Sequence, residues 1–152
     1  MSNTDEELPR AVGINHVALP VEDVEQAVDF YGSLFAVDLR GRTDHAAFID
    51  MGDQFIALAA GETAADETRH IGLVVDDRDA VERRLEETGV ERLETNGLDF
   101  HDPWGNRIQV VEYAEVQFSK TDAVLEGMGL DLAKTDAALA ELAAKGMAPD
   151  DG

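Results

Sequence analysis

Residues 14–21, INHVALPV, and residues 69–75, RHIGLVV, are two copies of one sequence pattern. In both stretches apolar residues alternate with small or polar ones, which is typical of a β-strand with one face in a hydrophobic core. A helical pattern follows each stretch and begins at an aspartate, a residue that favours the first position of a helix. His16 and His70 hold the same place in the two copies. The chain is therefore predicted to contain an internal repeat.

The first copy continues with short apolar runs separated by turn residues, which predicts three further strands, at about residues 37–42, 46–51 and 54–60. Residues 102–110 match residues 50–58, so the second copy is predicted to have the same order of elements, with a short deletion in a loop. Each copy is thus expected to be a βαβββ module. The polar stretch at residues 61–68, GETAADET, is predicted to be the linker between the modules.

The character of the sequence changes after Tyr113. Residues 116–129 are predicted to contain a short helical turn, and residues 131–145 a helix with leucines and alanines at helical spacing. We expect this helix to cover a sheet or to contact a second subunit. Both chain ends, residues 1–9 and 148–152, are expected to be disordered. The predicted organisation is a domain over residues 12–113, with modules 12–60 and 69–113, and a helical extension over residues 114–147.

The composition is strongly acidic. The chain has 33 acidic and 12 basic residues, so its formal net charge is −21 at pH 7. The acidic residues are spread along the whole chain, which favours a halophilic protein from a very salty cytoplasm. Because such a field repels phosphate backbones, nucleic acid is not an expected partner. The chain has no cysteine, and this excludes disulfides and thiolate metal sites.

No signal-peptide pattern and no apolar run of membrane-spanning length is present in the sequence. We therefore expect a cytoplasmic protein with no membrane partner. The 44% of apolar residues are enough for a hydrophobic core without covalent cross-links.

Four stretches together resemble the vicinal oxygen chelate superfamily, which includes glyoxalases, bleomycin-resistance proteins and extradiol dioxygenases. They read NHVALPVEDVEQAVDFYGSLF, GDQFIAL, RHIGLVVDD and FHDPWGNRIQVVEY. The resemblance implies an α+β fold in which two tandem βαβββ modules form a curled mixed sheet around a ligand cavity. It also implies that metal ligands, where present, lie on the first and last strands of each module.

The resemblance places the four ligand positions of the family at His16, Ala57, His70 and Gln109. Ala57 has no donor atom, and Gln109 stands where most metalloenzymes of the family have glutamate. Two imidazoles and an amide leave the charge of a divalent ion uncompensated. We therefore expect His16, His70 and Gln109 to hold Mn, Ni, Zn or Fe weakly, with the absence of any metal an equal alternative.

Phe55, Ala57, Gln109 and His101 are the candidate residues of a ligand cavity. Small side chains near the two repeat-equivalent histidines would leave the space that a cavity requires. For Gln109, a buried amide whose hydrogen bonds are satisfied by neighbouring groups is an equal alternative. The sequence assigns no residue a catalytic role.

Three functions are consistent with these patterns. The first is a small-molecule-binding protein of the glyoxalase, bleomycin-resistance and dioxygenase type, with weak or no metal. The second is a divalent-metal-dependent lyase, isomerase or dioxygenase, in which His16, His70 and Gln109 hold an ion that polarises a carbonyl or enolate. The third is an interaction module without catalysis. A small-molecule ligand and a homodimer are expected, with the modules pairing within one chain or across the dimer.

Overall fold

The structure is a computed structural model that describes residues 8–10 and 12–147. The predicted α+β fold class is confirmed. The ends predicted to be disordered lie outside the described residues, apart from residues 8 and 9. In chain order the elements are β1 (His16–Val21), α1 (Val24–Leu34), β2 (Asp38–Arg42), β3 (Ala46–Asp50), β4 (Phe55–Ala60), β5 (Ile71–Val75), α2 (Arg78–Thr88), β6 (Leu98–His101), β7 (Arg107–Glu112), the 3₁₀ turn η2 (Tyr113–Glu115), α3 (Asp122–Gly127) and α4 (Asp136–Ala144).

The two modules pair their strands in the same way, as the internal repeat predicts. The first module forms one mixed sheet in the order β1-β4-β3-β2, with β1 parallel to β4. The second module forms a sheet in the order β5-β7-β6, with β5 parallel to β7. Ala18 lies opposite Ala57 in the first sheet, and Gly72 lies opposite Gln109 in the second. Ala18 follows His16 by two residues, and Gly72 follows His70 by two residues. The two pairs are therefore at equivalent places in the two modules.

The second module differs from the predicted βαβββ order because its second strand is reduced to one isolated bridge, Arg92 to Phe100. The Arg92 guanidinium binds Glu82 of α2 and the Gly97 carbonyl. The Thr95 hydroxyl accepts a hydrogen bond from the Gly97 N–H at 3.2 Å. Because these contacts make the chain turn tightly before β6, the segment around Arg92 does not run alongside β6 as a strand. The second sheet therefore has three strands where the first has four.

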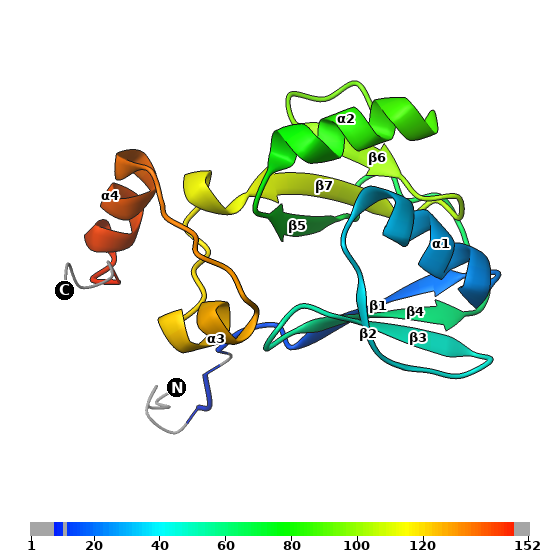
Figure 1. Cartoon of the computed structure of the whole chain (residues 1–152), viewed down its shortest axis with the longest axis horizontal. Coiled ribbons are helices and arrows are strands. Elements are labelled where there is room, and N and C mark those ends of the chain that lie inside the picture. Colours follow the sequence, from blue (N-terminus) through cyan, green and yellow to red (C-terminus); the bar gives the residue numbers. More distant parts are fainter. Residues whose placement is uncertain (1–7, 11, 148–152) are drawn as a thin grey trace, which may run out of the picture.

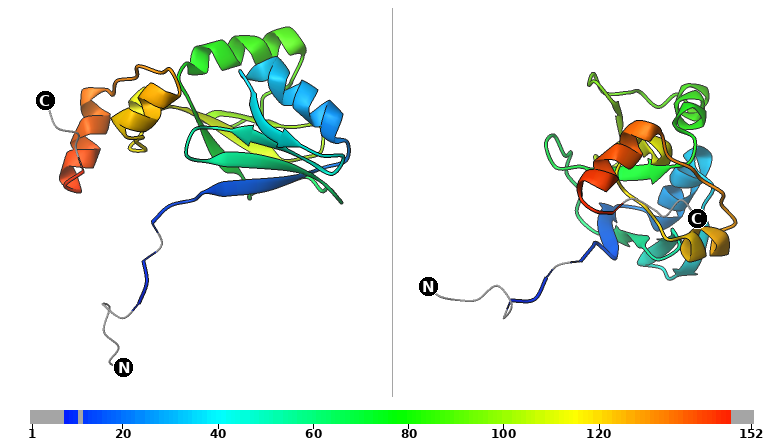
Figure 2. Two further views of the ribbon diagram at one scale, coloured as in Figure 1. Left: turned by 60° about the horizontal axis from the view of Figure 1, so that its bottom comes forward. Right: turned by 90° about the vertical axis from the view of Figure 1, so that its left-hand side faces the viewer.

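α1 and α2 pack against each other and cover the strands from one side (Figures 1 and 2). Both helices begin at the predicted aspartates: Asp23 accepts a hydrogen bond from the Gln26 N–H at 2.9 Å, and Asp77 accepts one from the Ala80 N–H at 3.1 Å. A single hydrophobic core joins the two modules. Its most deeply buried large members are Val21, Tyr31, Leu58, Leu85, Leu98, Phe100, Ile108 and Val110.

The DPWGN turn that begins at Asp102 ties the modules together. The buried Asp102 carboxylate accepts hydrogen bonds from the Tyr31 hydroxyl at 2.7 Å, from two backbone N–H groups of the turn and from Asn106 Nδ2. Asn106 Nδ2 also donates to the Pro20 carbonyl of β1 at 2.8 Å. Burial raises the pKa of Tyr31 far above its usual value, and the nearby Asp102 charge adds to this effect. Trp104 of the same turn is buried in the core.

The C-terminal extension lies at one end of the molecule, beside the two sheets (Figures 1 and 2). α3 and α4 lie within the ranges that the sequence predicts, but α4 begins later than expected. Lys134 is turned inward, where its Nζ donates to the carbonyls of Tyr113 at 2.6 Å and Val116 at 2.8 Å, and Thr135 becomes the N-cap. In the described part of the chain, no helix has both the length and the apolar character needed to cross a bilayer.

Candidate ligand cavity

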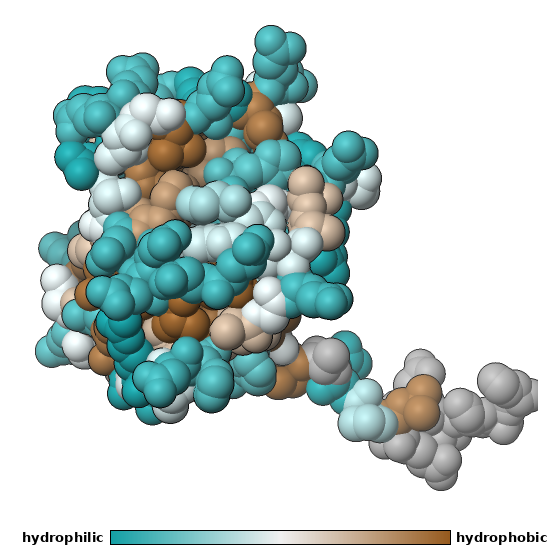
Figure 3. Space-filling model, turned by 90° about the vertical axis from the view of Figure 1, so that its right-hand side faces the viewer, coloured by the Kyte–Doolittle hydropathy of each residue, from teal (hydrophilic) through white to brown (hydrophobic). Residues whose placement is uncertain are grey.

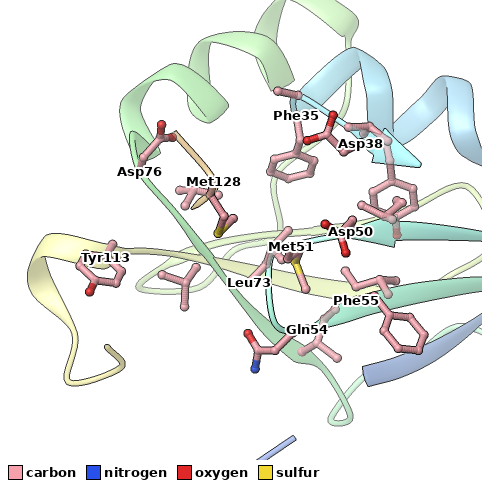
Figure 4. Close-up of a pocket in the computed structure, with 18 of the residues that line it drawn as sticks. Phe35, Asp38, Asp50, Met51, Gln54, Phe55, Leu73, Asp76, Tyr113 and Met128 are labelled. Atoms are coloured by element: carbon pink, nitrogen blue, oxygen red, sulfur yellow. The ribbon is translucent and has the colours of Figure 1, made fainter. Parts of the chain in front are cut away.

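A cavity of about 760 Å³ lies between the two modules and the C-terminal extension. Apolar side chains from all three parts form most of its wall, with a few polar groups among them (Figure 4). This size and lining are typical of pockets that hold a small organic molecule. Its lining includes His16, Ala36, Asp38, Phe55, His70, Asp76, Arg84, Tyr113, Phe118, Lys120, Leu125 and Met128.

The two repeat histidines both line this cavity. The His16 ring stacks on Phe55 with centroids 4.7 Å apart, and its Nδ1 lies 3.0 Å from Asn15 Oδ1. His70 Nδ1 lies 2.9 Å from the Thr68 carbonyl oxygen. Because both partners are oxygen acceptors, Nδ1 carries the proton of the neutral ring and Nε2 keeps its lone pair. Each histidine can therefore accept a hydrogen bond at Nε2.

Ala57 and Gln109 are not among the residues that line the cavity. Ala57 is buried on β4, and Gln109 is half-buried on β7. The Gln109 amide lies against Gly97: a Cβ atom placed on that glycine would be 3.3 Å from Gln109 Nε2. The cavity thus brings together the histidines and Phe55, but not the amide. The role of Gln109 as a metal ligand stays a prediction.

His101 also lies outside the cavity lining. It is half-buried at the end of β6, where its Nε2 donates a hydrogen bond to the Asp66 carbonyl at 2.6 Å. The buried Asp99 carboxylate pairs with Arg107 at 3.0 Å, and Arg107 also donates to the Glu67 carbonyl. These contacts fasten the linker between the modules to β6 and β7. Sequence reasoning did not identify the Asp99–Arg107 pair, because its partners become neighbours only across the strand pair.

The side chains present do not fit a tightly held divalent ion. Among residues 8–10 and 12–147, no group of three histidine, cysteine, aspartate or glutamate side chains is placed to hold one. Two neutral imidazoles without a carboxylate leave most of the charge of the ion uncompensated. The site can therefore offer hydrogen-bond acceptors and apolar surface more readily than a metal centre.

Sequence reasoning also missed the wall that the C-terminal extension supplies. Tyr113 and Phe118 pack edge to face with ring centroids 6.3 Å apart, and Leu125 and Met128 of the α3 region complete this wall. The sequence pattern that could have predicted this wall is the pair of aromatic residues soon after the last strand, because large apolar side chains outside a domain usually pack against another surface. The pattern could not say which surface that is.

A family model described as the Glyoxalase/Bleomycin resistance protein/Dioxygenase superfamily matches residues 13–110. The chain belongs to this superfamily. The resemblance inferred from its sequence is therefore confirmed. Glutathione transferase FosA of Serratia marcescens is 26% identical to it in an alignment 110 residues long that covers 64% of this chain and 78% of that protein. The C-terminal extension lies beyond the matched region.

Several solved structures share the superfamily fold. A putative glyoxalase family protein from Bacillus anthracis has a TM-score of 0.58 at 21% identity, covering 69% of this chain and 98% of that one. The fosfomycin resistance protein FosX from Listeria monocytogenes has a TM-score of 0.57 at 18% identity, covering 68% and 94%. Lactoylglutathione lyase from Agrobacterium tumefaciens has a TM-score of 0.54 at 21% identity, covering 69% and 96%. Identities this low show a common fold, and functions differ widely on one fold.

Proposed function

We propose that this member of the superfamily binds a small organic molecule in the cavity between its modules, with weak or no metal. The observation that carries the proposal is a cavity of about 760 Å³ lined by both repeat histidines. Within the residues that the structure describes, Nε2 of His16 and Nε2 of His70 have no hydrogen-bond partner. Both atoms are thus available to a ligand at the edge of a mainly apolar space.

A metal-dependent enzyme is the second candidate. A FosX mutant from Listeria monocytogenes forms a complex with Mn(II) and a dihydroxypropylphosphonic acid. This relative is a reason to test divalent ions, whereas the side chains available in this chain favour weak affinity for the metal. His16 and His70 would hold such an ion, and Gln109 would have to move toward them.

Ligand binding can be measured with acetylated dansylcadaverine, a neutral fluorescent probe that brightens in apolar sites. We expect saturable binding of one probe per chain. Ala36→Trp, which adds an indole ring at the cavity wall, should weaken binding at least about tenfold through loss of space. Ala64→Trp is the matched control, because Ala64 is exposed in the linker and outside the cavity lining. Absence of saturable binding to the wild type would overturn the proposal.

Metal binding is tested separately by calorimetric titration of Mn, Ni, Zn and Fe(II) in high salt. We expect no metal to bind more tightly than about millimolar, because the site lacks a compensating carboxylate. Tight stoichiometric binding that is lost in a His16→Ala, His70→Ala double variant would favour the metal-dependent enzyme instead.

A homodimer is proposed as well. β1 and β5 are edge strands of their sheets, and each leaves one row of backbone N–H and C=O groups without a strand partner in the described residues. A second copy can cover these edges. Sedimentation equilibrium at micromolar concentration in high salt should give twice the chain mass, and a monomer at that concentration would refute this proposal.

A further inference from the structure

The positively charged side chains that line the cavity are already paired. Lys120 Nζ binds the Asp53 carboxylate, and this hydrogen bond holds the pKa of Asp53 below its usual value. Arg84 donates to the Ser33 carbonyl at 2.9 Å and to Glu87 at 2.6 Å. These cations are therefore poorly placed to bind an anionic ligand without losing their present partners.

Among the charged side chains of the lining, the two without a partner in the described residues are both carboxylates. Asp38 and Asp76 line the cavity, and in the described part of the chain neither carboxylate has a hydrogen bond or an ion pair. Figure 4 shows Asp76 at one side of the cavity and Asp38 at the other. Nε2 of His16 and of His70 adds two neutral acceptors. A ligand that fits this set must donate hydrogen bonds and gains from a positive charge.

The C-terminal extension supplies an apolar wall that is firmly held. Lys120 N–H donates to the Tyr113 hydroxyl at 3.2 Å, and Lys134 Nζ lies 3.7 Å from the centroid of the Tyr113 ring. Met128 packs against the turn between β3 and β4, where a Cβ atom placed on Gly52 would be 2.6 Å from its sulfur. The extension therefore bridges from the second module back to the first. Its wall can bury the apolar part of a ligand.

We infer that the cavity takes an organic cation with a large apolar body and an N–H-bearing amine. The ammonium group pairs with Asp38 or Asp76, a histidine Nε2 accepts a hydrogen bond from a second N–H of the ligand, and the apolar body lies against Tyr113 and Phe118. This inference rests on the proposed function, because it names the ligand class for the same cavity. It also assigns a role in specificity to the C-terminal extension, which lies beyond the family match.

The preferred charge of the ligand can be tested with three dansyl probes that differ only in their end group. They are dansylcadaverine with an ammonium, its neutral acetylated form, and dansyl-aminohexanoic acid with a carboxylate. Titrations belong at about 1 M KCl, where the Debye length is about 3 Å and the net charge of the chain is screened. We expect affinity to fall about tenfold at each step from ammonium to neutral to carboxylate.

The double variant Asp38→Asn, Asp76→Asn should remove the preference for the ammonium probe and leave the affinity for the neutral probe within about twofold. The control Asp29→Asn, Glu86→Gln changes the net charge equally at exposed helix positions outside the cavity lining, and it should keep the preference. Equal effects of the two double variants would overturn the inference, since the preference would then come from net charge alone.

The wall is tested by Phe118→Ala, which should weaken all three probes by a similar factor of about five to ten. Leu139→Ala, in α4 and outside the cavity lining, is the control and should leave all three unchanged. If the neutral probe binds but shows no preference by charge and no response to Phe118→Ala, the inference fails while the proposed function stands. If no probe binds, the proposed function itself fails.

Discussion

At the scale of single residues, the Tyr31–Asp102 hydrogen bond is the clearest contact between the modules. Tyr31 is on α1 of the first module, and Asp102 opens the turn before β7 of the second. Both side chains are buried, and the carboxylate accepts hydrogen bonds from the turn on its other sides. Removing the hydroxyl leaves a buried charge with one partner fewer.

Tyr31→Phe is expected to lower the free energy of unfolding by about 1.5–3 kcal/mol, the range for a hydrogen bond to a charged group. Urea denaturation of both proteins in high salt measures the difference. Tyr113→Phe is the control, because in the part of the chain that the structure describes the Tyr113 hydroxyl has one hydrogen bond, a long one of 3.2 Å from the Lys120 N–H. Losses of equal size in the two variants would contradict a special role for the buried pair.

The same residue predicts how stability depends on alkaline pH. The pKa of Tyr31 is raised in the folded protein by burial and by the Asp102 charge, above the ordinary value of 10.0. The folded state therefore favours the protonated phenol, and its contribution to stability is complete below pH 10.0 and is lost as pH rises beyond it. Unfolding free energies between about pH 8 and about pH 11 should fall more steeply in the wild type than in Tyr31→Phe. Parallel curves would refute this assignment.

At the scale of elements, glycines make close contacts between segments that are distant in the sequence. Gly105 has a φ of 89°, and a Cβ atom placed on it would lie 2.5 Å from the Ala65 Cα atom of the linker. The Asp66 N–H also donates to the Gly105 carbonyl at 2.8 Å. The turn before β7 can therefore approach the linker only because this residue has no side chain.

Gly105→Ala should destabilise the protein by about 2 kcal/mol or more, from the unfavourable φ and from displacement of the linker backbone. Gly61→Ala is the matched control: among the described residues beyond its chain neighbours, no atom lies within 4 Å of the added Cβ, and the φ of Gly61 is not positive. Thermal denaturation of the three proteins should show a loss only for Gly105→Ala. If the melting temperature of Gly105→Ala equals that of the wild type, the linker backbone can shift without loss of stability and the prediction is wrong.

The C-terminal extension depends on Lys134. Burial lowers the pKa of this amine, which nevertheless donates to two carbonyls of the segment before α3. Lys134→Met keeps most of the apolar stem but removes these donors, so the extension should be cleaved faster by chymotrypsin. Lys145→Met is the control, because among the described residues the Lys145 amine makes one hydrogen bond, to the exposed Gln117 side chain at 2.5 Å. Equal cleavage rates would show that Lys134 does not hold the extension.

At the scale of the whole molecule, charge is the dominant property. The net charge of −21 is carried mainly by exposed side chains, and Figure 3 shows a face on which hydrophilic side chains surround separate hydrophobic patches. Like charges at this density oppose the compact state. The acidic composition favours a protein adapted to a salty cytoplasm, and such a protein should be stabilised by salt.

The midpoint of urea unfolding should rise steadily as KCl increases from about 0.1 M to about 2 M, because the Debye length falls from about 10 Å toward 3 Å or less. Sucrose solutions of matched osmolarity control for preferential exclusion of solute. A midpoint that does not change with KCl would contradict the halophilic proposal, whatever the outcome of the binding experiments.

Much of the fold followed from local pattern. The alternation in residues 14–21 and 69–75 and the caps Asp23 and Asp77 predicted strands and helices that the structure contains. These signals are local because backbone hydrogen bonding and side-chain periodicity act between neighbours in the chain. The reduced second strand at Arg92 was not predicted, since it depends on contacts with α2.

The sequence by itself determined the superfamily, the repeat and the equivalent places of His16 and His70. Only the tertiary structure decided that both histidines share a cavity whose third wall is the extension after Tyr113, and that Gln109 and His101 lie outside its lining. The reason is physical. A cavity is enclosed by side chains that are far apart in the chain, and their meeting depends on how the modules and the extension pack together, which no local periodicity encodes.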